Sequence, residues 1–177
     1  LYTLARLTAR PDLTVEQVLG EFYAAFGPAA DEVRDYFAHW ESLCEGVQER
    51  PEGMHWSYFY READRVFNSD AMDRGEELLA IAETAARDDE TSLARVQWLQ
   101  KGLRNARLTL ETQQAYETYR QEGALSGYRD AITELDDYRA SIEGEVVCNM
   151  GFLAWAEQRT WDRELLTLMA QPGDPLP

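Results

Sequence analysis

Acidic side chains are the most abundant chemically active groups in this sequence. Its 177 residues include 33 Asp and Glu against 17 Lys and Arg, which gives a formal net charge of -16. Paired carboxylates can act as acid and base in sugar hydrolysis, so Asp136 with Asp137, and Glu143 with Glu145, are candidates by spacing. Because so many carboxylates produce such pairs by chance, we interpret them as solvated helix faces.

Histidine, cysteine and serine form no recognisable catalytic or metal-binding pattern. His39 and His55 do not match the two-histidine motif of helical zinc sites, and a histidine at the edge of the core is the simpler interpretation. Cys44 and Cys148 are too few for a disulfide framework and lack metal-ligand spacing. Three serines, Ser57, Ser69 and Ser126, lack the glycine-flanked turn that exposes a nucleophile. We therefore predict no catalytic residue, no metal site and no cofactor.

Aromatic residues are the one suggestive excess. Five Trp and nine Tyr supply flat surfaces with a polar tip, of the kind that stack on sugar rings or anchor a partner. Trp56, Tyr58 and Tyr60 lie in a loop-like stretch, where functional residues concentrate, so they are our candidates for ligand contact. Three others lie at or beside apolar stripes and are predicted to pack in the core or at a domain interface: Trp40, Trp98 and Trp155.

The elements that must position these residues are predicted to be helices, because apolar residues recur at three- and four-residue steps. Strand-like alternation is not evident, and no repeat of solenoid length occurs. The longest periodic segment, from about 90 to 122, predicts a helix of roughly 30 residues, about 45 Å long. The other predicted helices cover residues 1–9, 14–26, 28–49, 69–87 and 126–142, with a short one near 161–168. Residues 146–155 are either a separate buried helix or a kinked continuation of the preceding one, and 54–60 is an irregular or short helical segment.

Local signals mark several helix ends. Thr14 and Gln17 form a capping box, in which each side chain satisfies a free backbone donor of the other residue. Gly27 suits a left-handed helix cap, and Pro28 suits the first turn of the following helix. Gly123 is predicted to end the long helix, and Ser126 to cap the next one.

These patterns predict an all-α helical bundle of about five to seven helices with one long central helix. Residues 11–171 are expected to form a single helical domain, and residues 172–177 a frayed tail. Residues 1–10 are expected to be the end of a preceding element, since the sequence begins without an initiator Met or a signal-peptide pattern. We therefore expect this chain to be a fragment of a longer polypeptide.

The composition limits the classes of partner. The chain is 45% hydrophobic and 28% charged, which is typical of a packed domain and too apolar for a disordered one. A net charge of -16 disfavours nucleic acid and anionic membranes, both of which attract Lys and Arg. The sequence contains no run of about 18 apolar residues, so no membrane span is expected.

Several segments resemble one known family. They are LARL at 4–7, PD at 11–12, EFYAAFGPAADEVRDYF at 21–37 and ARVQWLQKGL at 94–103. They are similar to the helical region that follows the catalytic barrel in a family of bacterial glycoside-hydrolase-like proteins, formerly listed as a domain of unknown function. Some members of that family are endo-acting β-N-acetylglucosaminidases. The family's catalytic carboxylates belong to its (β/α)₈ barrel, so no catalytic residue is carried over to this chain.

The resemblance implies a non-catalytic helical accessory domain that packs on an upstream catalytic barrel of the same polypeptide and walls its sugar-binding cleft. It also implies carbohydrate as a further partner, and a secreted, periplasmic or cell-surface location. The parent protein would be a glycoside hydrolase, while this chain alone would have no activity. The alternative from another class is a helical protein-protein interaction or scaffolding module. A third, a freestanding enzyme, predicts a pocket with convergent carboxylates and shifted pKa values.

Overall fold

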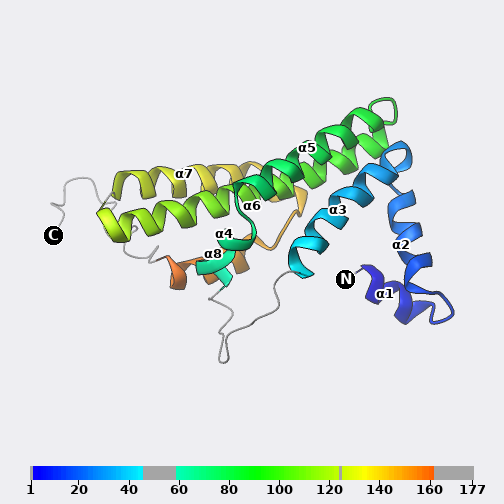
Figure 1. Cartoon of the computed structure of the whole chain (residues 1–177), viewed down its shortest axis with the longest axis horizontal. Helices are drawn as coiled ribbons and strands as arrows, with labels where there is room; N and C mark the ends of the chain where they lie inside the picture. The colour runs from blue at the N-terminus through cyan, green and yellow to red at the C-terminus, as the bar shows by residue number, and fades with distance from the viewer. Residues whose placement is uncertain (1, 46–58, 124, 162–177) are drawn as a thin grey trace. The chain divides into compact units, whose positions relative to one another are not determined.

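The computed structural model describes residues 2–45, 59–123 and 125–161 (Figure 1). These residues form helices and turns and contain no strand, which confirms the predicted all-α class for the described part of the chain. The predicted long helix is confirmed as α6, whose 33 residues make it about 50 Å long. The described residues contain eight α-helices, one more than the upper end of the expected five to seven.

The α-helices are α1 (Tyr2–Ala9), α2 (Val15–Ala24), α3 (Ala30–Glu45), α4 (Phe59–Val66), α5 (Ser69–Ala86), α6 (Glu90–Glu122), α7 (Leu125–Ser141) and α8 (Met150–Thr160). Two 3₁₀ helices, η1 (Gly27–Ala29) and η3 (Glu143–Glu145), lie between them. By internal contacts the chain divides into two compact units. Unit 1 contains the described residues up to 45 and 73–100, and unit 2 contains those of 59–72 and 101–161. The expectation of a single domain stays a prediction.

In unit 1, helix α2 begins at the capping box that the sequence predicts. The Gln17 backbone N–H donates to Thr14 Oγ1 at 3.3 Å, and the Thr14 backbone N–H donates to Gln17 Oε1 at 2.8 Å. Each bond satisfies a donor that the first helical turn leaves unpaired. The start of α2 is therefore determined by these two local side chains.

The corner after α2 is built around Gly27, which adopts a left-handed φ of +53° as predicted. A Cβ atom at Gly27 would lie 2.5 Å from Ser92 Oγ, so glycine is needed both for its backbone angle and for the close approach of the start of α6. Pro28 lies at the start of η1, which leads directly into α3. The Arg95 guanidinium of α6 donates to the Ala25 carbonyl oxygen at the end of α2.

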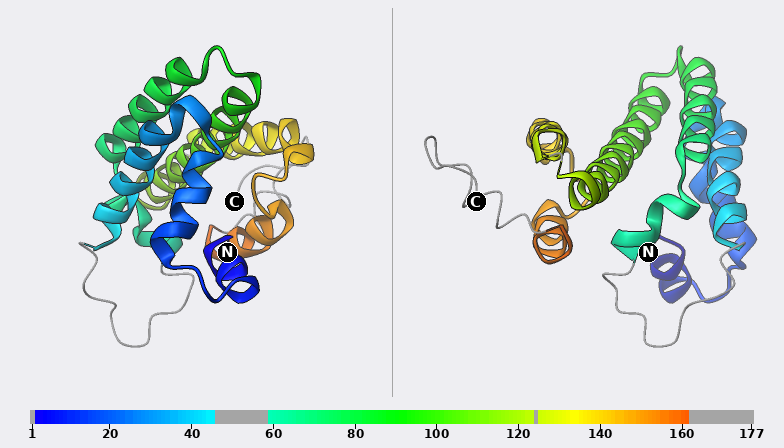
Figure 2. Two further views of the ribbon diagram at one scale, coloured as in Figure 1. Left: turned by 90° about the vertical axis from the view of Figure 1, so that its right-hand side faces the viewer. Right: turned by 60° about the vertical axis from the view of Figure 1, so that its left-hand side comes forward.

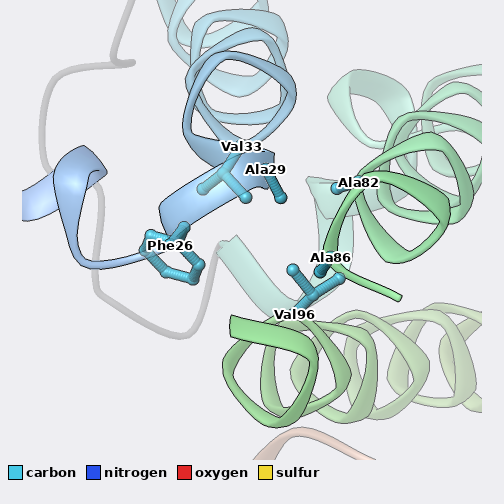
Figure 3. Close-up of a cluster of buried hydrophobic side chains, with 6 residues drawn as sticks. All are labelled: Phe26, Ala29, Val33, Ala82, Ala86 and Val96. Carbon is cyan, nitrogen blue, oxygen red and sulfur yellow. The ribbon is translucent and has the colours of Figure 1, made fainter. Parts of the chain in front are cut away.

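The core of unit 1 lies among α3, α5 and the start of α6 (Figures 2 and 3). α5 and α6 are joined by a short turn, and Asp89 Oδ1 accepts the Ser92 backbone N–H at 2.7 Å to cap α6. The small residues Ala82 and Ala86 on α5 allow the neighbouring helices to approach closely. The buried cluster consists of Phe26, Ala29, Val33, Ala82, Ala86 and Val96.

In unit 2, α7 runs antiparallel to the C-terminal part of α6. Thr112 Oγ1 donates to the Ala131 carbonyl at 3.3 Å, and the Tyr138 hydroxyl donates to the Lys101 carbonyl at 3.0 Å. The predicted break at Gly123 is confirmed by its left-handed φ of +73°. The predicted cap at Ser126 is wrong, because the Leu125 N–H donates to the Gly123 carbonyl at 2.8 Å and α7 already begins at Leu125.

The core of unit 2 is aromatic. Tyr119 and Tyr128 stack with ring centroids 5.8 Å apart, and the Tyr128 hydroxyl donates to the backbone carbonyl of Trp161. Trp161, at the end of α8, is 1% exposed. The buried cluster consists of Leu108, Tyr116, Tyr128, Leu135 and Trp161. These contacts bring α8 against α6 and α7 within this unit.

Candidate functional site: a buried arginine–glutamate cluster

The aromatic candidates from the sequence fall almost entirely beyond what the structure describes. Trp56 and Tyr58 lie outside the described residues. Tyr60 belongs to α4 by its backbone, but its side chain also lies outside the described residues. Ligand contact by these three residues therefore stays a prediction.

The most distinctive polar site is a buried ion pair in unit 2 between Arg139 of α7 and Glu157 of α8. Arg139 is 5% exposed and Glu157 is fully buried. The guanidinium binds the carboxylate through two parallel contacts, NH1 to Oε2 at 2.7 Å and NH2 to Oε1 at 2.8 Å. Such a forked pair is among the strongest hydrogen-bonded arrangements of side chains, and its geometry is directional.

Helix α6 supplies the remaining partners of Arg139. Asn105 Oδ1 accepts the Arg139 Nε–H at 2.9 Å, and Thr109 Oγ1 accepts from NH2 at 3.1 Å. The Thr109 hydroxyl in turn donates to the Asn105 carbonyl at 2.8 Å. All three guanidinium nitrogens and both carboxylate oxygens are thus bonded to the protein, as buried charges require.

Cys148 lies at the edge of this cluster. Its sulfur is 3.8 Å from Asn105 Nδ2 and 3.3 Å from the Met150 sulfur. Burial raises the pKa of the Cys148 thiol above its ordinary value of 9.0, the positive charge of Arg139 acts in the opposite direction, and Glu157 adds to the increase. A thiol kept protonated is a poor nucleophile, so the cluster does not activate Cys148.

The role of this cluster is therefore structural, because its charged hydrogen bonds join α6, α7 and α8. The sequence carries a signal for this pair. Arg139 falls four residues after Leu135 on the apolar stripe of its helix, and Glu157 is the one charged residue between positions 146 and 158. A charge on an apolar stripe is seldom buried without a partner.

Trp98 is 42% exposed and Trp155 is 43% exposed, so neither packs in a core of the described residues, which was one of the two predicted positions. Trp40 is half-buried and packs edge-on against Tyr36, with ring centroids 5.9 Å apart. The other half of that prediction, a domain interface, is untested. The tryptophan that fills a core among the described residues is Trp161, for which we predicted only a short helix.

The carboxylate pairs considered in the sequence lie on the surface. Asp136 and Asp137 are exposed on α7, while Glu143 and Glu145 are exposed in η3. Glu145 pairs with Lys101 at 2.5 Å, an ordinary surface ion pair. His39 is half-buried beside Trp40, as expected for a histidine at the edge of the core, whereas His55 lies outside the described residues.

Two shallow hollows lie along α6. One, of about 500 Å³, is lined by Glu90, Thr91, Ala94, Arg95 and Trp98. The other, of about 490 Å³, is lined by Arg104, Leu108, Asp130, Thr133, Glu134, Asp137 and Tyr138. Its three carboxylates lie four and three residues apart on one exposed face of α7, and Glu134 pairs with Arg104 at 2.7 Å. This arrangement is typical of a solvated helix face.

No protein-family model, curated protein or solved structure matches this chain. Among the described residues, three or more His, Cys, Asp or Glu side chains are nowhere grouped to hold a metal ion. The helices in the described ranges also lack the combination of length and apolar character that crossing a bilayer requires. The residues themselves are therefore the basis for a functional proposal.

Proposed function

We propose that this chain is a non-catalytic helical accessory domain of a multidomain glycoside-hydrolase-like protein, and that it packs on the catalytic barrel of that polypeptide. The resemblance of residues 4–7, 11–12, 21–37 and 94–103 to such a helical region supports this proposal. Carbohydrate as a further partner and a secreted, periplasmic or cell-surface location belong to the same proposal.

The observation that carries the non-catalytic part of the proposal is the closure of the Arg139 cluster. Each guanidinium nitrogen of Arg139 and each carboxylate oxygen of Glu157 makes a hydrogen bond to another helix, at 2.7 to 3.1 Å. A catalytic site needs polar groups directed at a space where substrate can bind. Here the polar chemistry holds helices together, which is the work of a supporting domain.

The second candidate is a helical protein-protein interaction or scaffolding module. The exposed aromatic pair Phe152 and Trp155 on α8 favours it, because aromatic residues are enriched at protein interfaces. Both functions require a surface that binds another folded domain. They differ in whether that domain belongs to the same polypeptide.

Two experiments test the proposal. The sequence of the whole gene should encode a (β/α)₈ barrel before Leu1, and its absence would leave the interaction module as the better hypothesis. This chain alone should release no product from β-N-acetylglucosaminide substrates, whereas the whole polypeptide should do so if it is active. Hydrolysis by this chain that one carboxylate substitution abolishes would overturn the non-catalytic assignment.

A further inference from the structure

The connection between α7 and α8 contains a strained residue. Residues 143–149, which we name the strap, begin with η3 and end at Asn149, whose side chain caps α8. Val146 follows η3 in the left-handed conformation, with a φ of 53° and a ψ of 37°. The other two described residues with a positive φ are glycines, Gly27 and Gly123. A β-branched residue in this conformation is an outlier, because its Cβ atom crowds the backbone.

The contacts that hold Val146 in this conformation come from its neighbours in the strap. The Val146 side chain is 79% exposed, so its own burial offsets little of the strain. Val147 lies against α6, with its Cγ1 atom 3.5 Å from the position that a Cβ atom would take on Gly102. The Cys148 sulfur is 3.8 Å from Asn105 Nδ2, one turn further along α6. A strained residue persists when its surroundings determine its conformation in this way.

A surface ion pair also holds the strap. Lys101 Nζ of α6 lies 2.5 Å from Glu145 Oε1, directly before Val146, and the two side chains are 36% and 44% exposed. An exposed pair of this kind changes an equilibrium by less than about fivefold. Left-handed strain in an L-residue changes it by roughly five- to thirtyfold in the opposite direction. The strain is therefore at least as large as the contribution of the ion pair, and the strap is held weakly.

We propose that the strap is a conformational switch that opens while the rest of unit 2 stays folded, and that the Lys101–Glu145 pair is its latch. In the open state Val146 returns to an ordinary negative φ, and the Cys148 thiol becomes exposed to solvent. The C-terminal half of α8 stays in place, because the buried ion pair of Glu157 holds it. Since salt screens exposed charges, ionic strength sets the open fraction. This switch does not depend on the proposed function.

The test is the rate at which iodoacetamide, an uncharged reagent, labels Cys148, with the exposed Cys44 of unit 1 as the internal reference. Val146→Gly should slow the labelling of Cys148 about fivefold, because glycine adopts the left-handed angle without strain and so favours the closed strap. Val146→Asn should slow it about twofold, since asparagine tolerates this angle better than valine does. Val15→Gly is the matched control at an exposed valine of helix α2, and it should not slow the labelling.

The latch is tested by removing its charges. Lys101→Met and Glu145→Gln should each speed up the labelling of Cys148 about threefold, and the double variant should be no faster than either, because both remove the same pair. Sodium chloride at about 1 M should have this effect on the wild type and none on Lys101→Met. Arg120→Met is the matched control, since it removes a surface pair with Glu117 in the same unit, 19 residues along α6, and it should leave the rate unchanged.

Circular dichroism will establish that the variants fold. Hydrogen exchange of the Glu145 backbone N–H, which donates to the Ile142 carbonyl at 3.0 Å, should change in parallel with the labelling of Cys148. Labelling that Val146→Gly and Lys101→Met leave unchanged would overturn the inference. So would labelling with the urea dependence of global unfolding, because a local opening exposes far less surface.

Discussion

Arg139 and Glu157 lose their hydration on folding and regain hydrogen bonds from each other and from α6. The loss of hydration is costly for each ion, and the forked contact at 2.7 and 2.8 Å offsets it. The stability of unit 2 therefore depends on the pair being either complete or wholly absent. A single remaining charge is the unfavourable case.

Substitution of one partner should be far more damaging than substitution of both. We expect Arg139→Met and Glu157→Leu each to lower the free energy of unfolding by about 3–5 kcal/mol, because each leaves the other charge buried and unpaired. The double variant should recover most of that loss. Urea unfolding of the three variants measures this coupling.

Arg104→Met provides the control for this series. Arg104 pairs with Glu134 at 2.7 Å on the surface, with 44% of its side chain exposed, so its loss should cost less than about 1 kcal/mol. If the double variant loses the sum of the two single losses, the pair is not coupled and our interpretation of the cluster is wrong.

The two cysteines should differ in reactivity. Cys44 is exposed, whereas Cys148 is half-buried with a raised pKa. Because the thiolate is the reactive form, a disulfide reagent such as DTNB at pH 8 should modify Cys44 at least about tenfold faster than Cys148. Mass spectrometry of partly modified protein will assign the sites. Faster modification of Cys148 would contradict its protected position.

At the scale of elements, close backbone approach fixes the corner between α2 and α3. The left-handed angle of Gly27 would be strained for any L-residue, and Ser92, 3% exposed, occupies the space that a Cβ atom would need. Gly123 has the same kind of angle with open space around it. A comparison of substitutions at the two glycines therefore distinguishes the effect of the backbone angle from the effect of the contact with Ser92.

Gly27→Ala should destabilise the protein more than Gly123→Ala. At Gly123 we expect the free energy of unfolding to fall by roughly 1 kcal/mol, from the backbone angle alone. At Gly27 we expect a fall of roughly 2–4 kcal/mol, because the new Cβ atom would also clash with Ser92. Thermal unfolding of both variants tests this order. A rescue of Gly27→Ala by Ser92→Ala would identify the contact, and equal losses at the two glycines would disprove its importance.

At the scale of the whole molecule, carboxylates that accept hydrogen bonds couple the stability of the fold to pH. Hydrogen bonds lower the pKa of four carboxyl groups. The largest cause is the Arg10 side chain for Asp12 and the residue's own backbone for Glu16. It is the Gln100 side chain for Glu83 and the Ser92 backbone N–H for Asp89. All four residues belong to unit 1. A lowered pKa stabilises the folded state above the ordinary value, and this contribution is lost as the pH falls through the folded value.

We therefore expect the stability of unit 1 to fall as the pH drops below the ordinary values of 4.5 for Glu and 3.8 for Asp. Urea unfolding between pH 6 and pH 3, followed by hydrogen exchange in each unit, measures this loss. Asp89→Asn keeps an N-cap oxygen but cannot titrate, so it should be less sensitive to acid than the wild type. Stability that rises on acidification would show that relief of the net charge of -16 dominates.

The sequence predicts those parts of the fold that local interactions determine. The capping box of Thr14 and Gln17, the left-handed Gly27 and the long periodic helix α6 each depend on residues close together in the chain. The start of α7 was misplaced because a turn at Gly123 starts the helix before Ser126. Two plausible helix starts one residue apart cannot be separated by residue type alone.

The candidate site could not be predicted in the same way. Arg139 and Glu157 are 18 positions apart on different helices, and no periodicity within either helix indicates that they meet. The exposure of Trp98 and Trp155 has a similar origin. One helical residue turns the side chain by about 100°, so a tryptophan beside an apolar stripe can lie on either side of the boundary. Tertiary packing decides both questions.

The position of Glu157 has a consequence for the number of ways in which α8 can pack. A helix with apolar residues on several sides can be rotated about its axis and still bury a comparable area, so the hydrophobic effect alone distinguishes its orientations poorly. Rotation by one residue, about 100°, would carry the Glu157 carboxylate away from Arg139 and leave two unpaired ions. We infer that this single acid removes the rotational ambiguity of α8, and that chains lacking the pair would sample several packed orientations of that helix.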